Sequence, residues 1–461
     1  MSNAELSATP ESVAHAESLL CAFDRCLIAG FARQGSEHKQ TFESLGRVFQ
    51  GTPLATPVGD AAAALLQSQV GEEHLLAMAC AREALQGARH DALMAQAVAA
   101  LGGSVAPAEN TASGAAGDGS AEAAAYMGST RQWLVELALA GLAQLEAPNV
   151  VPFADTLEAM QGMPELFGLS ALLTGFVDEL SDHLPTSAMA EIPARRWADL
   201  WARSMIGAWR PGPQPAVTEV SGSLQVLGAD VRIHDHLVSV VAYGLLTADG
   251  NDRRLARATI SAWKVDAMAG DEVWTAFADL AGGNTLLAAI AGQKALTIRN
   301  MPLTAHGDLL WNGDAELGKG FDPLAVAIEA LAPGAGLRIP DTPALMRHPV
   351  HIAIPVALDN AAYGGDKRQP TVTIAGAEVP LAIDRLGPPS GIDRATATTL
   401  QQVFGLMRYD AERWQFQPLV GRAKKNLVGP GVSMGNGLKV KRAGGTLGIL
   451  QERASKLLRK S

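Results

Sequence analysis

One stretch of this sequence, residues 217–266, constrains the fold more than any other, because it reads as consecutive β-strands. Its first apolar and β-branched runs are too short for typical helices, and residues 255–264 alternate in the two-residue period of a strand. Glycine and asparagine within residues 248–252 tolerate the positive φ angles that a tight turn requires. The stretch therefore predicts an antiparallel meander of strand, strand, turn and strand.

The residues on either side of this meander differ in pattern. Apolar residues recur at helical spacing before it, which predicts helical regions over residues 1–104 and 121–210. Between them, residues 105–120 are rich in Gly, Ser and Ala without an apolar period, which predicts a linker or long loop. Residues 216–440 mix strands and helices, and residues 441–461 predict a basic amphipathic tail helix. The expected fold class is α+β multidomain: an N-terminal all-α helical domain followed by an α+β domain with a mainly antiparallel sheet.

Shorter segments carry local predictions of their own. Residues 72–85 and 91–101 predict two separate helices. Residues 371–383 predict a hairpin around Ala375-Gly376. Residues 392–407 predict a further helix.

The composition of the whole chain limits the classes of protein to consider. With 461 residues, 48% of them hydrophobic and 18% charged, the chain suggests two or three domains and can bury a sizeable core. Its formal net charge of −10 argues against general nucleic-acid binding by the whole protein, but a local basic site remains open. The three cysteines, Cys21, Cys26 and Cys80, cannot form a disulfide framework and fit a reducing cytoplasm. With no signal-peptide pattern and no stretch of ~18 consecutive apolar residues, we expect a cytoplasmic protein without a membrane span.

The segment 193–209 combines tryptophans and arginines at helical spacing. Trp197 and Trp201 fall on one face, and Arg203 is among the arginines on the rest of the helix. One interpretation is an aromatic and basic face that docks a protein partner. The other, which the sequence favours, is a helix that packs its tryptophans onto a neighbouring domain. Trp197, Trp201 and Arg203 are therefore candidate interaction residues with a structural alternative.

The end of the chain differs from the rest in charge. Residues 421–461 contain ten Lys or Arg and one acid, Glu452, so this segment carries +9 and the first 420 residues carry −19. An anionic partner, the acidic body of the protein itself or solvent could each meet this charge, and the last two are the simpler explanations. An alternative function is nucleic-acid binding through the tail, which would weaken steeply with salt. The basic candidates are Lys424, Lys425, Lys439, Lys441, Arg442, Lys456, Arg459 and Lys460.

The cluster His234-Asp235-His236 is the one most suggestive of chemistry. On a strand, His234 and His236 would point to the same face and could bind one metal ion together. Tetrahedral zinc needs two further ligands, and nothing in the sequence connects this cluster to other histidines. A metal-dependent hydrolase using these two histidines is a second alternative function, and a polar strand end is the ordinary explanation. The other histidine candidates are His306, near Asp308, and the pair His348 and His351.

A glycine-rich segment, residues 429–437, invites comparison with a phosphate-binding loop. Such a loop needs a lysine after its last glycine to meet the phosphates, but Asn436 follows Gly435 here. No GxGxxG sequence lies in a βαβ unit, and no GxSxG elbow surrounds Ser433. The sequence therefore predicts no cofactor and assigns no catalytic residue.

Four segments of the sequence together resemble a known group of proteins. They resemble bacterial proteins of operons that encode a MoxR-type AAA+ ATPase and a von Willebrand A-domain protein. Some neighbours in such operons carry a SWIM zinc finger, but its CxC and Cys-x-His pattern is missing from this chain, so no zinc ligands carry over. The resemblance implies a cytoplasmic accessory protein and implies no reaction. The phrases are RRWADLWARSMIG (195–207), VSGSLQVLGADVRIHDHLVSVVAYGLL (220–246), RATISAWKVD (257–266) and MPLTAHGDLLWN (301–312).

Together these features predict a non-enzymatic interaction or scaffold protein, and the resemblance implies an accessory of a MoxR AAA+ and von Willebrand A-domain chaperone-like system. The expected partner is a protein, either the AAA+ ATPase or the A-domain protein. The hydrolase and the nucleic-acid binder described above are the two alternatives.

Overall fold

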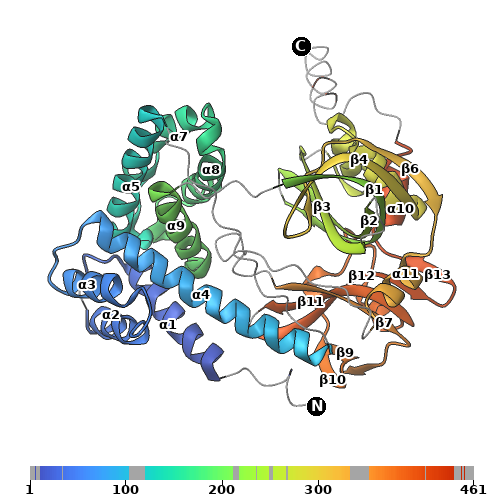
Figure 1. Cartoon of the computed structure of the whole chain (residues 1–461), viewed down its shortest axis with the longest axis horizontal. Helices are drawn as coiled ribbons and strands as arrows, with labels where there is room; N and C mark the ends of the chain where they lie inside the picture. The colour runs from blue at the N-terminus through green and yellow to red at the C-terminus, as the bar shows by residue number, and fades with distance from the viewer. Residues whose placement is uncertain are drawn as a thin grey trace.

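The computed structural model describes residues 6, 11–33, 35–102, 120–210, 217–234, 236–248, 253–265, 268–332, 352–410, 412–440, 448 and 451. Helices gather in the N-terminal part and strands in the C-terminal part, and the two parts lie side by side (Figure 1). The predicted fold class is thereby confirmed, since the strands pair mainly antiparallel. Most of the predicted linker and nearly all of the predicted tail helix lie outside the described residues. No described helix is long and apolar enough to cross a membrane.

The N-terminal part packs its helices around one apolar core. Apolar residues spaced three or four apart give each helix an inward stripe, as Leu20, Phe23 and Leu27 do in the first helix, where all three are fully buried. The last helix, α9, contacts α1, α4, α5 and α8 and so lies near the centre of this part. The helices are α1 (Glu11–Ala29), α2 (Ser36–Val48), α3 (Ala55–Leu66), α4 (Glu72–Ala100), α5 (Ala121–Ala140), α6 (Ala147–Val150), α7 (Phe153–Gln161), α8 (Phe167–Ser181) and α9 (Ala194–Trp209).

Helix α4 is a single helix of 29 residues, so the prediction of separate helices over residues 72–85 and 91–101 is wrong. Gly87 lies within this helix, and an isolated glycine is tolerated when tertiary packing supports the helix around it. Gly87 is buried within α4, among residues that contact α1, α3 and α9.

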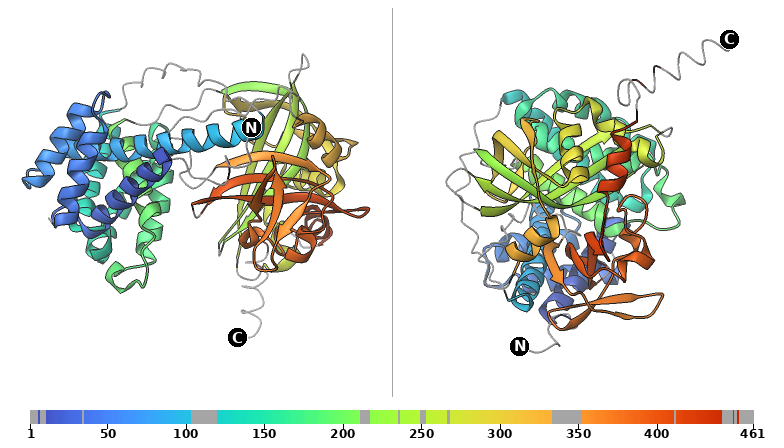
Figure 2. Two further views of the ribbon diagram at one scale, coloured as in Figure 1. Left: turned by 90° about the horizontal axis from the view of Figure 1, so that it is seen from below. Right: turned by 90° about the vertical axis from the view of Figure 1, so that its right-hand side faces the viewer.

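The C-terminal end of α4 reaches the strands of the other part. Leu93 and Ala97 are fully buried in a core that also holds Ile354 and Phe416. Trp414 donates a hydrogen bond from Nε1 to the side chain of Gln96 (3.1 Å). Figures 1 and 2 both show α4 crossing from the helical part to the C-terminal strands, so this helix belongs to two cores at once.

The C-terminal part begins with a small closed barrel. The predicted meander is present as β1 (Val217–Ile233), β2 (Leu237–Ala248) and β3 (Arg253–Trp263), paired antiparallel. The 3₁₀ segment η4 (Gly270–Asp279) and α10 (Gly283–Gly292) lead to β4 (Lys294–Thr304), β5 (Asp308–Leu309) and β6 (Ala315–Gly320).

The barrel closes because β1 pairs with β2 and also with β4. β5 pairs antiparallel with β4 and parallel with β3, which gives the closed order β1-β2-β3-β5-β4, with β6 added outside β4. Five strands in this order, with a helix between the third and the fourth, have the connectivity of an OB-type barrel.

Two glycines bend the long strand β1 so that it can pair with both β2 and β4. The register of β1 shifts near Gly222 and near Gly228, which marks β-bulges. A Cβ atom at Gly222 would clash with the carbonyl of Thr247, and one at Gly228 would lie 2.8 Å from the ring of Phe404. Glycine therefore permits close approach at both bends.

A second sheet packs against the barrel and corrects one prediction. It has the order β13-β12-β11-β7, all antiparallel, with β7 (Ala353–Asp359), β11 (Gln402–Asp410), β12 (Arg413–Ala423) and β13 (Asn426–Val428). The helix predicted over residues 392–407 is wrong, because only α12 (Arg394–Ala397) is helical there and β11 follows it. Most of β11 is buried on both faces, so its apolar residues form a run without the alternation that identifies a strand.

The remaining elements complete the C-terminal part. The predicted hairpin around Ala375-Gly376 is confirmed: both turn residues have positive φ (49° and 81°), as a two-residue hairpin turn requires. This hairpin joins β9 (Pro370–Ile374) to β10 (Ala377–Pro380), and β8 (Tyr363–Gly365) pairs with β9. Helix α11 (Pro323–Ala330) packs in the core between barrel and second sheet, and α13 (Gly431–Gly437) packs on α10 and η4.

Candidate functional site

The two histidines predicted as metal ligands lie in a turn and not in a strand. β1 ends at Ile233 and β2 begins at Leu237, so His234 and His236 occupy the connection, and both are exposed. Asp235, between them, lies outside the described residues, as do His348 and His351. Among the described residues, no three His, Cys, Asp or Glu side chains are close enough together to hold a metal ion. The strand geometry on which the metal hypothesis depended is therefore wrong.

The tryptophans predicted as a possible docking face are in the core. Trp197 and Trp201 are fully buried, and Trp201 donates a hydrogen bond from Nε1 to the carbonyl of Leu134 on α5 (2.9 Å). Arg203 lies beside them with a side chain that is 12% exposed and paired with acids. A partner could not reach the tryptophans in this fold, so the docking interpretation is corrected and the packing interpretation holds.

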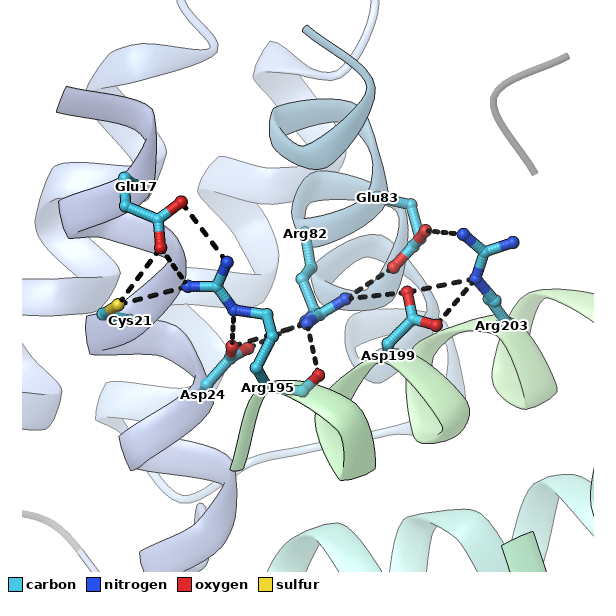
Figure 3. A network of polar contacts seen from close by, with 8 residues as sticks. All are labelled: Glu17, Cys21, Asp24, Arg82, Glu83, Arg195, Asp199 and Arg203. Carbon is cyan, nitrogen blue, oxygen red and sulfur yellow. Dashed lines mark hydrogen bonds and ion pairs between the residues drawn. The ribbon is translucent and has the colours of Figure 1, made fainter. Parts of the chain in front are cut away.

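The structure instead joins charged residues of α1, α4 and α9 in a buried network (Figure 3). Arg82 of α4 is at its centre, with a fully buried side chain. It donates from Nε to Asp24 Oδ1 (2.8 Å) and from Nη1 to Glu83 Oε1 (2.7 Å). It also donates to Asp199 Oδ1 (3.4 Å) and to the carbonyl of Arg195 (3.1 Å). One guanidinium thus links residues up to 117 positions away in the sequence.

Arg195 of α9 forms the side of the network nearest α1. It donates from Nε to Asp24 Oδ2 (2.8 Å) and from Nη2 to Glu17 Oε1 (2.7 Å) and to Cys21 Sγ (3.1 Å). Burial acts to raise the pKa of Glu17, but the hydrogen bond and charge of Arg195 hold it below its usual value. Burial raises the pKa of the Cys21 thiol, so its surroundings favour the neutral form over a reactive thiolate.

Two acids meet on the other side of the network. Arg203 donates from Nε to Asp199 Oδ2 (2.9 Å) and its Nη2 lies 3.7 Å from Glu83 Oε2. Burial, and then the neighbouring charge of Asp199, raise the pKa of Glu83 to about 7, against the opposing effect of Arg82 and Arg203. Glu83 therefore exchanges its proton near neutral pH.

This network is suited to holding helices together. Its charges nearly balance, and its members donate to and accept from one another, as buried charges must. One feature of the sequence does indicate this network: charged residues interrupt the apolar stripes of two helices. Asp24 follows Leu20 by four residues and precedes Leu27 by three, so it interrupts an apolar stripe of α1, as Arg82 interrupts the stripe of Met78 and Leu85 in α4.

The described basic candidates near the end of the chain are exposed. Lys424 and Lys425 form the turn between β12 and β13, and Lys439 follows α13. Lys441, Arg442, Lys456, Arg459 and Lys460 lie outside the described residues.

The glycine-rich segment 429–437 has a packing role. A Cβ atom at Gly437 would lie 2.6 Å from the carbonyl of Asp271 and 2.6 Å from Cβ of Trp274, and Trp274 donates a hydrogen bond to Ser433 (2.8 Å). Gly437 thus allows α13 to lie directly on η4, which gives this glycine a packing role.

A second polar cluster lies where the barrel meets the second sheet. Asp230 of β1 is buried and accepts from Gln417 Nε2 (2.8 Å) and from Arg232 Nη2 (2.9 Å). Arg408 of β11, whose side chain is 4% exposed, donates to Gln417 Oε1 (2.7 Å) and lies 3.8 Å from Asp230 Oδ2. Two guanidinium groups therefore share a single buried carboxylate.

The electrostatics of this cluster are positive. Burial, together with the nearby charge of Arg385, lowers the pKa of Arg408 despite the attraction of Asp230. Burial raises the pKa of Tyr243, next to the cluster, to about 12, so its hydroxyl stays protonated. The excess of arginine is enclosed between the barrel and the second sheet, where the side chains of Arg408 and Asp230 are 4% and 2% exposed.

Comparison with known proteins assigns no family to this fold and these sites. No family model, no curated protein and no solved structure matches the chain. The resemblance to proteins of MoxR operons therefore stays a prediction.

Proposed function

We propose that this protein is a non-enzymatic scaffold, an accessory of a MoxR AAA+ and von Willebrand A-domain chaperone-like system. Its partner in this proposal is the ATPase or the A-domain protein. The resemblance of four phrases of the sequence supports the choice of system, and the architecture supports the role of a scaffold.

The observation that carries the proposal is the way α4 joins the two parts. A helix of 29 residues is about 43 Å long at 1.5 Å per residue, and it is built into the helical core at one end and the sheet core at the other. A scaffold needs two binding surfaces at a fixed separation. A continuous helix anchored at both ends can fix that separation. The buried network around Arg82 adds to this, because it fixes the rotation of α4 against α1 and α9.

A test uses purified proteins from the same operon. The full chain is mixed with the ATPase, with the A-domain protein and with both, and the complexes are measured by light scattering after size exclusion and by titration calorimetry. The proposal predicts a complex of defined stoichiometry with at least one of the two. If neither binds, with or without ATP, the assignment to this system is wrong.

The two alternatives receive different support. His234 and His236 lie exposed in a turn, and no specific contact favours the hydrolase. Nucleic-acid binding through residues 421–461 depends on basic side chains of which Lys424, Lys425 and Lys439 are described and exposed, and the others lie outside the described residues.

A further inference from the structure

The exposed side of α8 carries a stripe whose two halves differ in character. Phe167, Ala171 and Gly175 follow one another every four residues, and Asp178 and Asp182 continue the row to the end of the helix. Residues three or four apart lie on the same side of a helix, so these residues form one line. All of them are exposed, and the opposite side of α8 is buried in the helical core. They are called the α8 stripe below.

The first half of the α8 stripe leaves room for a second helix. A Cβ atom added at Gly175 would have no neighbour within 4 Å, and the same is true of Gly168 beside the stripe. Ala171 between them presents only a methyl group, and small residues let a second helix approach closely. Phe167, 50% exposed, offers apolar surface at one end. This half can therefore receive the apolar side of an amphipathic helix.

The second half of the α8 stripe places negative charge where a helix disfavours it. The C-terminal end of a helix carries a partial negative charge, so cations there are stabilising and acids are not. Asp178 lies in the last turn of α8 and Asp182 at its C-cap, and that turn contains no basic residue. Among the described residues, no cation pairs with either carboxylate, and the nearby Arg196 pairs with Glu179 (2.6 Å). This end of α8 therefore favours a cation from another segment.

The surroundings of the α8 stripe add to its negative charge. Residues 121–193 contain ten acids and one Lys or Arg, so this segment carries −9. Its one arginine, Arg131, pairs with Glu72 of α4 (3.0 Å). Gln161 of α7 donates a hydrogen bond to Thr174 of α8 (3.2 Å), which brings Glu158, one turn earlier on α7, toward the stripe. The ten acids are Glu122, Glu136, Glu146, Asp155, Glu158, Glu165, Asp178, Glu179, Asp182 and Glu191. A basic segment matches the charge of this region.

We propose that residues 441–461 of the same molecule dock on the α8 stripe. This segment carries six Lys or Arg and one acid, so its charge is +5, and the structure describes only Gly448 and Gln451 of it. Its apolar residues recur at helical spacing, and residues 446–460 as a helix would be about 22 Å long, close to the length of the α8 stripe. Its late cations follow an apolar first half, as acids follow small residues along α8, so the two helices would pack parallel. The apolar residues are Leu447, Leu450, Ala454, Leu457 and Leu458, and the late cations are Arg453, Lys456, Arg459 and Lys460.

The covalent connection favours this segment over a separate partner. Exposed ion pairs are individually weak and are screened by salt, so a free basic peptide would bind poorly. A segment of the same chain is held at an effective concentration of about millimolar, which is enough for a weak contact. The segment begins after Val440, close to α13 on the barrel, and its 21 residues span up to ~70 Å when extended. Figure 1 shows α8 at the border of the helical part that faces the barrel, so docking there would link the two parts a second time.

The test uses the full chain with a photocrosslinker in the basic segment. The crosslinking residue p-benzoylphenylalanine replaces Leu450, the protein is illuminated at low and at high salt, and mass spectrometry locates the residues to which position 450 becomes attached. The proposal predicts attachment within residues 167–178, with a yield that falls as salt rises. A mixture of isotope-labelled and unlabelled protein shows whether the attachment lies within one molecule, as expected.

Substitutions in the α8 stripe separate docking from general attraction between charges. Asp178→Asn together with Asp182→Asn is expected to lower the yield about fivefold, the size expected for two exposed ion pairs. Ala171→Gln fills the space on the stripe without a change of charge, and it is expected to lower the yield by at least as much.

Matched controls lie on α5, where Glu122→Gln with Glu136→Gln removes two exposed acids and Ala124→Gln enlarges an exposed alanine. Neither control is expected to change the yield, and circular dichroism checks that every variant retains its helices. The proposal is overturned if position 450 attaches to nothing on α8, if it attaches only between molecules, or if the stripe variants crosslink like the wild type. A lower yield in the charge variant but not in Ala171→Gln would indicate nonspecific attraction, which also overturns docking.

Discussion

Among single residues, Arg82 is the one whose loss should cost the most. It is fully buried and donates to three carboxylates, so Arg82→Met would leave buried acids without their counter-charge. Removing one partner of a buried ionic group costs about 3–5 kcal/mol, and we expect a loss of this size in the free energy of unfolding, measured with urea. Arg25→Ala is the control, because Arg25 and Glu37 form an exposed pair worth under about 1 kcal/mol. Equal effects of the two changes would contradict a structural role for the network.

Glu83 should make the stability of the helical part depend on pH. Its pKa is about 7 in the fold against 4.5 in the unfolded chain, so between these values the folded state holds a proton that the unfolded state has lost. The free energy of unfolding therefore falls as pH rises through this window. Glu83→Gln cannot titrate, and the advantage of the wild type over this variant should shrink by about 1–3 kcal/mol from pH 5 to pH 8. Parallel stability curves for the two proteins would mean that Glu83 is ionised throughout.

The residues of the candidate sites show what a sequence can and cannot tell. The packing role of Trp197 and Trp201 followed from their helical spacing, because a stripe of large apolar side chains has few alternatives to burial. The pairing of Asp24 with Arg82 did not follow, since the two are 58 positions apart and only the fold brings them together. Likewise, Asp230 of the barrel and Arg408 of the second sheet come together only because the fold packs the barrel against this sheet.

At the scale of elements, the contact of α13 with η4 gives a prediction that two substitutions in the same helix can test. Gly437→Ala would place a methyl group 2.6 Å from the Asp271 carbonyl and from Trp274 Cβ, and should cost about 1–3 kcal/mol. Gly435→Ala, two residues earlier, would meet only Cβ of Ala291 at an ordinary 3.4 Å. Alanine favours a helix over glycine, so this variant should be neutral or stabilised by up to about 1 kcal/mol. Thermal unfolding of both would show whether the helix is seated as closely as the structure has it.

The elements that the sequence predicted are those with a clear local signal. The meander was predicted from short β-branched runs and from the alternation of residues 255–264, and the Ala375-Gly376 turn has residues that accept positive φ, so both were predicted correctly. β11 was missed because burial on both faces removes the alternation. Closure of the barrel through pairing of β1 with β4 could not be predicted from the sequence, since strand pairing between distant segments leaves no local pattern.

For the whole molecule, the question is whether α4 keeps the two parts at a fixed separation. Leu93 is fully buried in the sheet core near the end of α4. Leu93→Asp would bury an unpaired carboxylate there, which costs more than the contact provides, so the end of α4 should leave the sheet. We expect the radius of gyration from small-angle scattering to increase, while circular dichroism shows the helices and strands retained.

The same variant connects the architecture to the proposed scaffold. If a partner contacts both parts, loss of their fixed separation removes the benefit of binding two linked surfaces, and affinity should fall at least tenfold. Ala95→Asp is the matched control, because Ala95 is exposed and only two residues away on the same helix. A partner that binds Leu93→Asp as tightly as the wild type contacts one part alone. In that case α4 would serve the stability of the protein, and the protein would not act as a two-surface scaffold.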